Sequence, residues 1–150
     1  MPRNKRHVTS IVFFYLVALF TGCAKEINVA LNLTSPEGAF ESSFRAVKYK
    51  QYGKAIQCMS KNYRIQFGEE ENSQIRNLER MGKNMKYKKS WQRVITKVEY
   101  GPFDDGSDVH VLYAEYEDNK VKIQNAIMPF IREDGLWKIA LLKSDQTRNG

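Results

Sequence analysis

The sequence is short of the residues from which disulfide, metal and nucleophilic sites are built. Its 150 residues include two cysteines, two histidines and four prolines. Two cysteines exclude a disulfide framework, and two histidines leave little for a metal site or a catalytic triad. The sequence also has no glycine-rich phosphate loop, no paired-cysteine motif and no nucleophile elbow. We therefore expect no cofactor and no metal.

The sequence also lacks an apolar run long enough to cross a membrane. The nearly uncharged segment 11–22 has 12 residues, about 18 Å of helix against a hydrocarbon core of about 30 Å. Arg3, Lys5 and Arg6 precede it, and small residues follow it. A basic start, a short apolar segment and small residues at its end are typical of a secretory signal peptide.

The end of this segment indicates a more specific cellular location. Phe20-Thr21-Gly22-Cys23 resembles the lipobox of bacterial lipoproteins, in which the chain is cut before a diacylated cysteine. The resemblance implies that 1–22 is a signal peptide and that lipid on Cys23 anchors the protein in the bacterial envelope. Ala24 favours the outer membrane if the bacterium has two membranes. The alternatives are an ordinary signal peptide with an incidental cysteine and a retained membrane anchor.

Positive charge is concentrated in one stretch of the chain. The whole sequence carries a net charge of +7, and 21 basic and 17 acidic residues remain without the signal peptide. Segment 76–97 contains eight basic residues and one acidic residue. The candidate basic patch consists of Arg80, Lys83, Lys86, Lys88, Lys89 and Arg93. A solvated helix end is its simplest interpretation; anionic headgroups or an acidic partner are the alternatives, and nucleic acid is not expected of an exported protein.

The first half of the mature chain has helical periodicity. Residues 23–34 show no strong pattern and are interpreted as a lipidated tether, so the folded domain is expected over 35–145, with a tail over 146–150. Ser35-Pro36-Glu37 has the cap, proline and acid of a helix start. Three helices are expected, with apolar faces formed by Phe40, Phe44 and Val47, by Ala55, Ile56 and Met59, and by Ile75, Leu78, Met81 and Met85 over 69–87. Cys58 is expected to be a buried, reduced thiol.

The second half has the alternation of strands. Strands are expected over 93–100, 108–117, 120–132 and 136–143. Asp118-Asn119 predicts a two-residue turn, and Glu133-Asp134-Gly135 a three-residue turn. Short turns make neighbouring strands antiparallel. The predicted fold class is therefore α+β, with three N-terminal helices on a four-stranded antiparallel meander. The third strand is apolar on both faces, so we expect a partner subunit, the tether or the strand's own curl to cover the second face.

This layout resembles the NTF2-like superfamily, and within it small bacterial lipoproteins with a DUF4878-like domain of unknown function. Segments 35–40, 52–55 and 133–139 carry the resemblance, in the expected order over nearly all of the mature chain. The resemblance implies a cone in which a curved sheet wraps the helices around a pocket. It also implies a possible homodimer that forms through the sheet.

Four residues are candidates for the wall of that pocket. A two-residue turn at Asp118-Asn119 places His110 and Tyr116 on one sheet face with Asn125, and Tyr63 is a further hydrogen-bond donor. The alternative is that these polar groups have structural hydrogen bonds, or that His110 faces water. Enzymes of the superfamily place an acid or histidine base in the cavity, but here only His110 is available.

The sequence thus predicts a non-enzymatic envelope lipoprotein that binds a small ligand, such as an apolar molecule, or another envelope component in its pocket. One alternative is an interaction protein that acts through its sheet face and basic helix end. The other is a cryptic acid–base enzyme built on His110.

Overall fold

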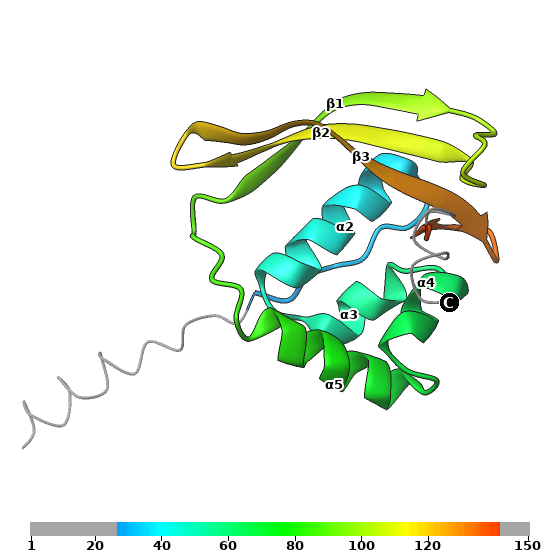
Figure 1. Cartoon of the computed structure of the whole chain (residues 1–150), viewed down its shortest axis with the longest axis horizontal. Coiled ribbons are helices and arrows are strands. Elements are labelled where there is room, and N and C mark those ends of the chain that lie inside the picture. The colour runs from blue at the N-terminus through cyan, green and yellow to red at the C-terminus, as the bar shows by residue number, and fades with distance from the viewer. Residues whose placement is uncertain (1–26, 142–150) are drawn as a thin grey trace, which may run out of the picture.

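A computed structural model describes residues 27–141 as an α+β fold, so the predicted signal peptide, Cys23 and the tail 146–150 lie outside the described residues. In chain order the elements are α2 (Pro36–Lys48), α3 (Tyr52–Gln57), α4 (Lys61–Arg64), the 3₁₀-helix η1 (Ile65–Phe67), α5 (Glu71–Gly82), β1 (Gln92–Tyr100), β2 (Val109–Glu117), β3 (Lys120–Glu133) and β4 (Leu136–Ile139). The helices lie on one side of the β1–β3 part of the sheet (Figure 1).

The four strands form an antiparallel meander in the order β1-β2-β3-β4, as predicted. Asp118 and Asn119 both have positive φ, 51° and 59°, and Glu117 pairs with Lys120, which confirms the two-residue turn. The last turn is one residue shorter than expected. Glu133 pairs with Leu136, so Asp134 and Gly135 alone form the turn, with φ of 54° and 78°. These angles match the primed turn whose twist suits flanking strands.

Helix α2 is the central element of the fold. The Ser35 hydroxyl accepts a hydrogen bond from the Gly38 backbone N–H, and Pro36 is the first helical residue, as predicted. The helix lies between the sheet and the remaining helices (Figure 1). Its Phe40 is 1% exposed, and the Phe40 ring centroid lies 5.0 Å from that of Tyr113 on β2. α2 therefore joins the two layers through one apolar core.

Helix α3 confirms the predicted inward face, since Ala55, Ile56 and Met59 are all buried. Cys58 is fully buried and has no disulfide partner among residues 27–141. Burial raises the pKa of the Cys58 thiol to about 11, although nearby Lys138 acts in the opposite direction. A thiol with such a pKa stays protonated near neutral pH and is a weak nucleophile.

The predicted tether is partly wrong, because its described part belongs to the fold. Val29 and Leu33 are buried. The Leu33 carbonyl accepts a hydrogen bond from Trp137 N–H, and the Ser42 hydroxyl accepts one from Asn32 N–H. Figure 1 shows this segment, in blue, running beside α2. Because it is extended, it buries alternate residues rather than a helical stripe.

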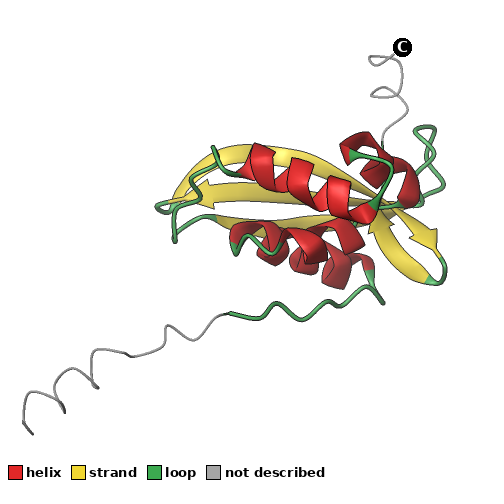
Figure 2. Cartoon of the chain, turned by 90° about the horizontal axis from the view of Figure 1, so that it is seen from below, coloured by secondary structure: helices red, strands yellow, loops and turns green. Residues whose placement is uncertain are grey.

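Helix α5 ends earlier than predicted, at Gly82 instead of residue 87. A Cβ atom at Gly82 would lie 2.7 Å from Tyr52 Cζ, so the helix and α3 meet closely here. Met81 and Met85, expected on an apolar face, are 53% and 47% exposed. The reason is that α5 packs mainly on α3 and η1, in the layer of helices farthest from the sheet (Figure 1). In the view from below, the helices lie in front of the sheet (Figure 2).

The two faces of β2 are opposite to the expectation. Val109, Val111 and Tyr113 belong to the hydrophobic core against the helices. Because strand residues alternate, His110 and Leu112 lie on the outer face, away from the helices. Ile127, which pairs with Leu112, is 52% exposed, so no described part of the chain covers the second apolar face of β3 there.

Candidate functional site

The predicted basic residues all lie in one segment, which joins α5 to β1. This linker strip comprises residues 80–93: the last turn of α5, a stretch without helix or strand over 83–91, and the start of β1. Lys86, Lys88 and Lys89 are therefore not at a helix end, which corrects the simplest interpretation of the patch. The structure divides the six cations into two groups with different surroundings.

Arg93 belongs to the first group, which is tied to the fold. Its Nε atom lies 2.9 Å from Glu115 Oε2, and the two side chains are 21% and 16% exposed. The Arg93 guanidinium also lies 5.0 Å, 5.1 Å and 5.6 Å from the ring centres of Tyr113, Trp91 and Phe44. A guanidinium that both pairs and stacks is held in one orientation. Arg93 is thus half-buried and paired, and does not belong to a free basic surface.

The aromatic rings of the linker strip extend this packing outward. Trp91 is 5% exposed and meets the Phe44 ring edge-on at 4.5 Å. Tyr87 stacks on Trp91 with ring centroids 4.0 Å apart and planes 15° apart. Burial raises the pKa of Tyr87, while the nearby charge of Arg93 lowers it less strongly. Tyr87 therefore covers Trp91 and fixes the course of the strip along the domain.

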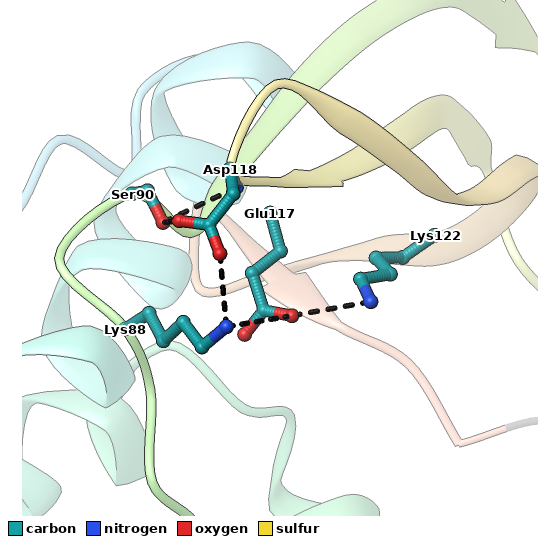
Figure 3. Close-up of polar contacts among 5 residues, drawn as sticks. All are labelled: Lys88, Ser90, Glu117, Asp118 and Lys122. Atoms are coloured by element: carbon teal, nitrogen blue, oxygen red, sulfur yellow. Dashed lines mark hydrogen bonds and ion pairs between the residues drawn. The ribbon is translucent and has the colours of Figure 1, made fainter.

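Lys88 is also paired, on the surface. Its Nζ atom lies 2.9 Å from Asp118 Oδ2 and 3.9 Å from Glu117 Oε2, as Figure 3 shows. The Ser90 hydroxyl donates to Asp118 Oδ1 at 2.6 Å, and Lys122 Nζ lies 3.3 Å from Glu117 Oε2. The hydrogen bonds from Lys88 and Ser90 lower the pKa of Asp118, and the bond to Asp118 raises that of Lys88. The acidic groups of this hairpin are thereby neutralised.

The remaining four cations form the second group. Arg80, Lys83, Lys86 and Lys89 are exposed, and none has an ion pair with any residue in 27–141. The exposed Met81 and Met85 lie between them in the sequence. We call these six residues the basic–apolar patch: Arg80, Met81, Lys83, Met85, Lys86 and Lys89. Sequence periodicity missed the methionines because helical spacing assigned them to a core.

Two open clefts border the linker strip. The first has a volume of about 440 Å³ and is lined by Lys50, Tyr52, Gly53, Ile75, Glu79 and Lys83. The second, of about 290 Å³, is lined by Lys86, Tyr87, Trp91, Glu115, Glu117, Lys122 and Ile123. A third cleft of about 300 Å³ lies at η1 and the start of α5, lined by Lys61, Arg64, Ile65, Glu69, Glu71 and Gln74. The four predicted pocket residues line none of these three clefts.

His110 lies in a separate cluster on the outer face. Its ring stacks on Phe103 with centroids 3.7 Å apart, and its Nε2 atom lies 2.7 Å from Asp105 Oδ2. Burial acts to raise the pKa of Asp105, but hydrogen bonds from Ser107 and His110 outweigh it and lower that pKa. Within 27–141, no group of three metal-ligating side chains is found here or elsewhere. The cluster holds the β1–β2 loop against the sheet.

The other three pocket candidates are dispersed. Tyr63 lies in α4 and packs against the core, with its ring 5.9 Å from that of Phe67. Tyr116 is half-buried on β2, opposite Gln92. Asn125 is exposed and has a φ of 53°, at a point where the β2–β3 pairing shifts register. The structure does not bring these residues together with His110.

Comparison of this chain with protein-family models, with curated proteins and with solved structures gives no match. A search of the described helices for one long and apolar enough to span a bilayer finds none.

Proposed function

We propose that this chain is a lipoprotein of the bacterial envelope, anchored by lipid on Cys23, whose NTF2-like domain acts through its surface and not as an enzyme. The observation that carries this proposal is the basic–apolar patch: four cations with no ion pair among residues 27–141 and two exposed methionines on one strip. Exposed apolar side chains among cations favour a binding surface over a solvated helix end.

A non-enzymatic role is supported by the positions of the titratable groups. His110, the predicted base, lines none of the three clefts and is engaged with Asp105 and Phe103. General acid–base catalysis needs a titratable group within hydrogen-bond reach of a bound substrate. The interior that the resemblance assigns to a pocket is occupied by Phe40, Tyr113 and Phe130.

The anchor is tested by Cys23→Ala. We expect the wild-type protein in the membrane fraction, with a mass increased by its fatty chains and the signal peptide absent. The variant loses both properties, because one cysteine thioether carries the diacylglyceryl group. Unchanged fractionation and mass in the variant would contradict the anchor. Cys58→Ala is the matched control, since the buried Cys58 is expected to leave both readouts unaltered.

The outer sheet face is the surface we propose for a homodimer. Ile127 and Val94 are 52% and 48% exposed on that face, with Leu112 beside Ile127. A second copy supplies a self-complementary apolar face, which a twofold dimer requires. We expect light scattering to give twice the monomer mass, and Ile127→Glu to give the monomer. A monomeric wild-type protein at high concentration excludes the dimer.

Binding of a small ligand is the second candidate function, in a cleft beside the linker strip instead of the predicted pocket inside the sheet. The cleft of about 290 Å³ next to Tyr87 and Trp91 is close to the lower size of ligand pockets, about 300 Å³, and combines aromatic rings with charged groups. Native mass spectrometry of protein purified from membranes tests this candidate. We expect a retained small molecule that Ile123→Glu releases, and its absence from the wild-type protein contradicts the idea.

A further inference from the structure

The basic–apolar patch lies at the same end of the molecule as the start of the described chain. The side chain of Gln51 holds the first described residues, through hydrogen bonds with the Ile27 carbonyl and the Val29 N–H. The next residue, Tyr52, packs against Gly82 within the linker strip. Figure 1 shows the beginning of the described chain at the end of the molecule where α5 leads into β1.

This position sets the distance between the patch and the proposed anchor. Cys23 precedes Ile27 by four residues, which span at most about 14 Å. A lipid-anchored Cys23 therefore holds the start of the described chain within about 14 Å of the bilayer surface. The end of the domain that carries the patch is then the end that meets the headgroups first.

The charges at this end favour an anionic surface. Glu117 and Asp118 are neutralised by Lys122 and Lys88, so the hairpin beside the strip presents little free negative charge. Four cations of the patch have no ion pair within the described chain, against the neighbouring Glu79. Clustered Lys and Arg beside an anchor are attracted by anionic lipid headgroups.

The methionines supply the apolar part of such a contact. Met81 and Met85 are 53% and 47% exposed, and Ile27 at the start of the described chain is 46% exposed. Flexible apolar side chains flanked by cations suit the boundary between headgroups and acyl chains. In water, exposure of these apolar side chains is unfavourable, so transfer to the acyl-chain boundary lowers the free energy.

We propose that the basic–apolar patch docks onto the anionic headgroup surface of the membrane that holds the Cys23 anchor, and so fixes the orientation of the domain. The proposal rests on the anchor of the proposed function and adds a second contact with the same membrane. In this orientation the linker strip faces the bilayer, and the outer face of the sheet remains free.

Reconstitution of the acylated protein tests docking and anchoring separately. The protein is placed in vesicles of phosphatidylcholine alone or of phosphatidylcholine with phosphatidylglycerol, and flotation is measured with peroxide oxidation of each methionine. The anchor predicts flotation with both vesicles. Docking predicts that oxidation of Met81 and Met85 slows about fivefold or more only with phosphatidylglycerol, and that 1 M salt, with a Debye length of about 3 Å, removes the difference.

Matched variants connect the protection to the patch. Lys86→Gln with Lys89→Gln is expected to abolish most of the protection, whereas Lys61→Gln with Lys97→Gln, an equal charge change on other elements, is expected to retain it. Buried Met59 is the internal control for a folded domain. Equal oxidation of Met81 and Met85 in the two kinds of vesicle overturns the docking proposal, and equal protection in both double variants does the same. Loss of flotation on pure phosphatidylcholine overturns the anchor instead.

Discussion

Helices α2 and α5 have almost the same length, 13 and 12 residues, but they differ in how many residues they bury and in how they are capped. α2 has a side-chain cap and buries six residues between the sheet and α3. α5 has no side-chain cap hydrogen bond and buries only Gln74 and Gly82. The inner helix therefore contributes to stability, while the outer helix and the strip that follows it present cations and methionines to the surroundings.

The largest expected effect is a difference in unfolding free energy between variants at apolar residues of the two helices. Phe40→Ala is expected to destabilise the domain by about 3–5 kcal/mol, because a fully packed ring leaves a cavity against Tyr113. Met81→Ala is expected to change stability by less than about 0.5 kcal/mol, since its side chain is exposed. Urea denaturation measures both. Similar losses for the two variants would contradict the division between inner and outer helix.

The next effect concerns Arg93, the half-buried cation of the linker strip. Arg93→Ala is expected to cost about 2–3 kcal/mol, because Glu115 loses its partner and three rings lose a stacked guanidinium. Arg93→Lys is expected to recover part of this, since it keeps the charge but not the planar fork. Lys86→Ala in the same strip is the control, with unchanged urea stability. A loss for Lys86→Ala as large as that for Arg93→Ala would show that the two groups of cations are not distinct.

A smaller effect distinguishes the two helix starts. Ser35→Ala removes the hydroxyl that accepts from Gly38 N–H and is expected to cost about 1 kcal/mol. Glu70→Ala is expected to cost little, because Glu70 makes no side-chain cap hydrogen bond at the start of α5. Thermal unfolding of the two variants measures the difference. Equal shifts in Tm would mean that the cap of α2 does not limit its stability.

The same contrast explains which parts of the fold could be predicted. Local signals suffice where residues close in sequence determine the structure. Ser35 and Pro36 define the start of α2, and Asp118-Asn119 defines a hairpin. They do not determine where α5 ends, because Met85 continues the helical spacing of Met81. The close approach of Tyr52, distant in sequence, to Gly82 accompanies that end in the structure.

The candidate site was harder to predict for a related reason. β2 has apolar residues on both faces, so alternation alone cannot say whether Val111 or Leu112 faces the helices. A register shift between β2 and β3 then places Asn125 outside the regular ladder. The pairing of His110 with Asp105 depends on the path of the β1–β2 loop, which composition does not encode. The cluster of cations was visible in the sequence, but its division into paired and free members was not.

The smallest expected effect concerns the surface ion pair between Lys88 of the linker strip and Asp118 of the β2–β3 turn. Asp118→Asn removes the carboxylate that pairs with Lys88, so we expect a small decrease in the urea midpoint at pH 7. The folded-state pKa of Asp118 is below its ordinary value, so its contribution is present above about pH 4 and is lost as pH falls through the folded pKa. The variant and the wild-type protein should therefore converge once the pH falls below the folded-state pKa.

Asp134→Asn is the matched control for this prediction, because Asp134 has the same place and a similar φ, 54°, in the other two-residue turn. Asp134 has no ion pair with a residue of the described chain, so its variant should follow the wild-type protein over the whole pH range of the experiment. A difference between Asp118→Asn and the wild-type protein that persists after the pH has fallen through the folded-state pKa of Asp118 would attribute the effect to turn geometry. Because both variants place asparagine at the first position of the turn, the comparison isolates the charge that holds the strip to the hairpin.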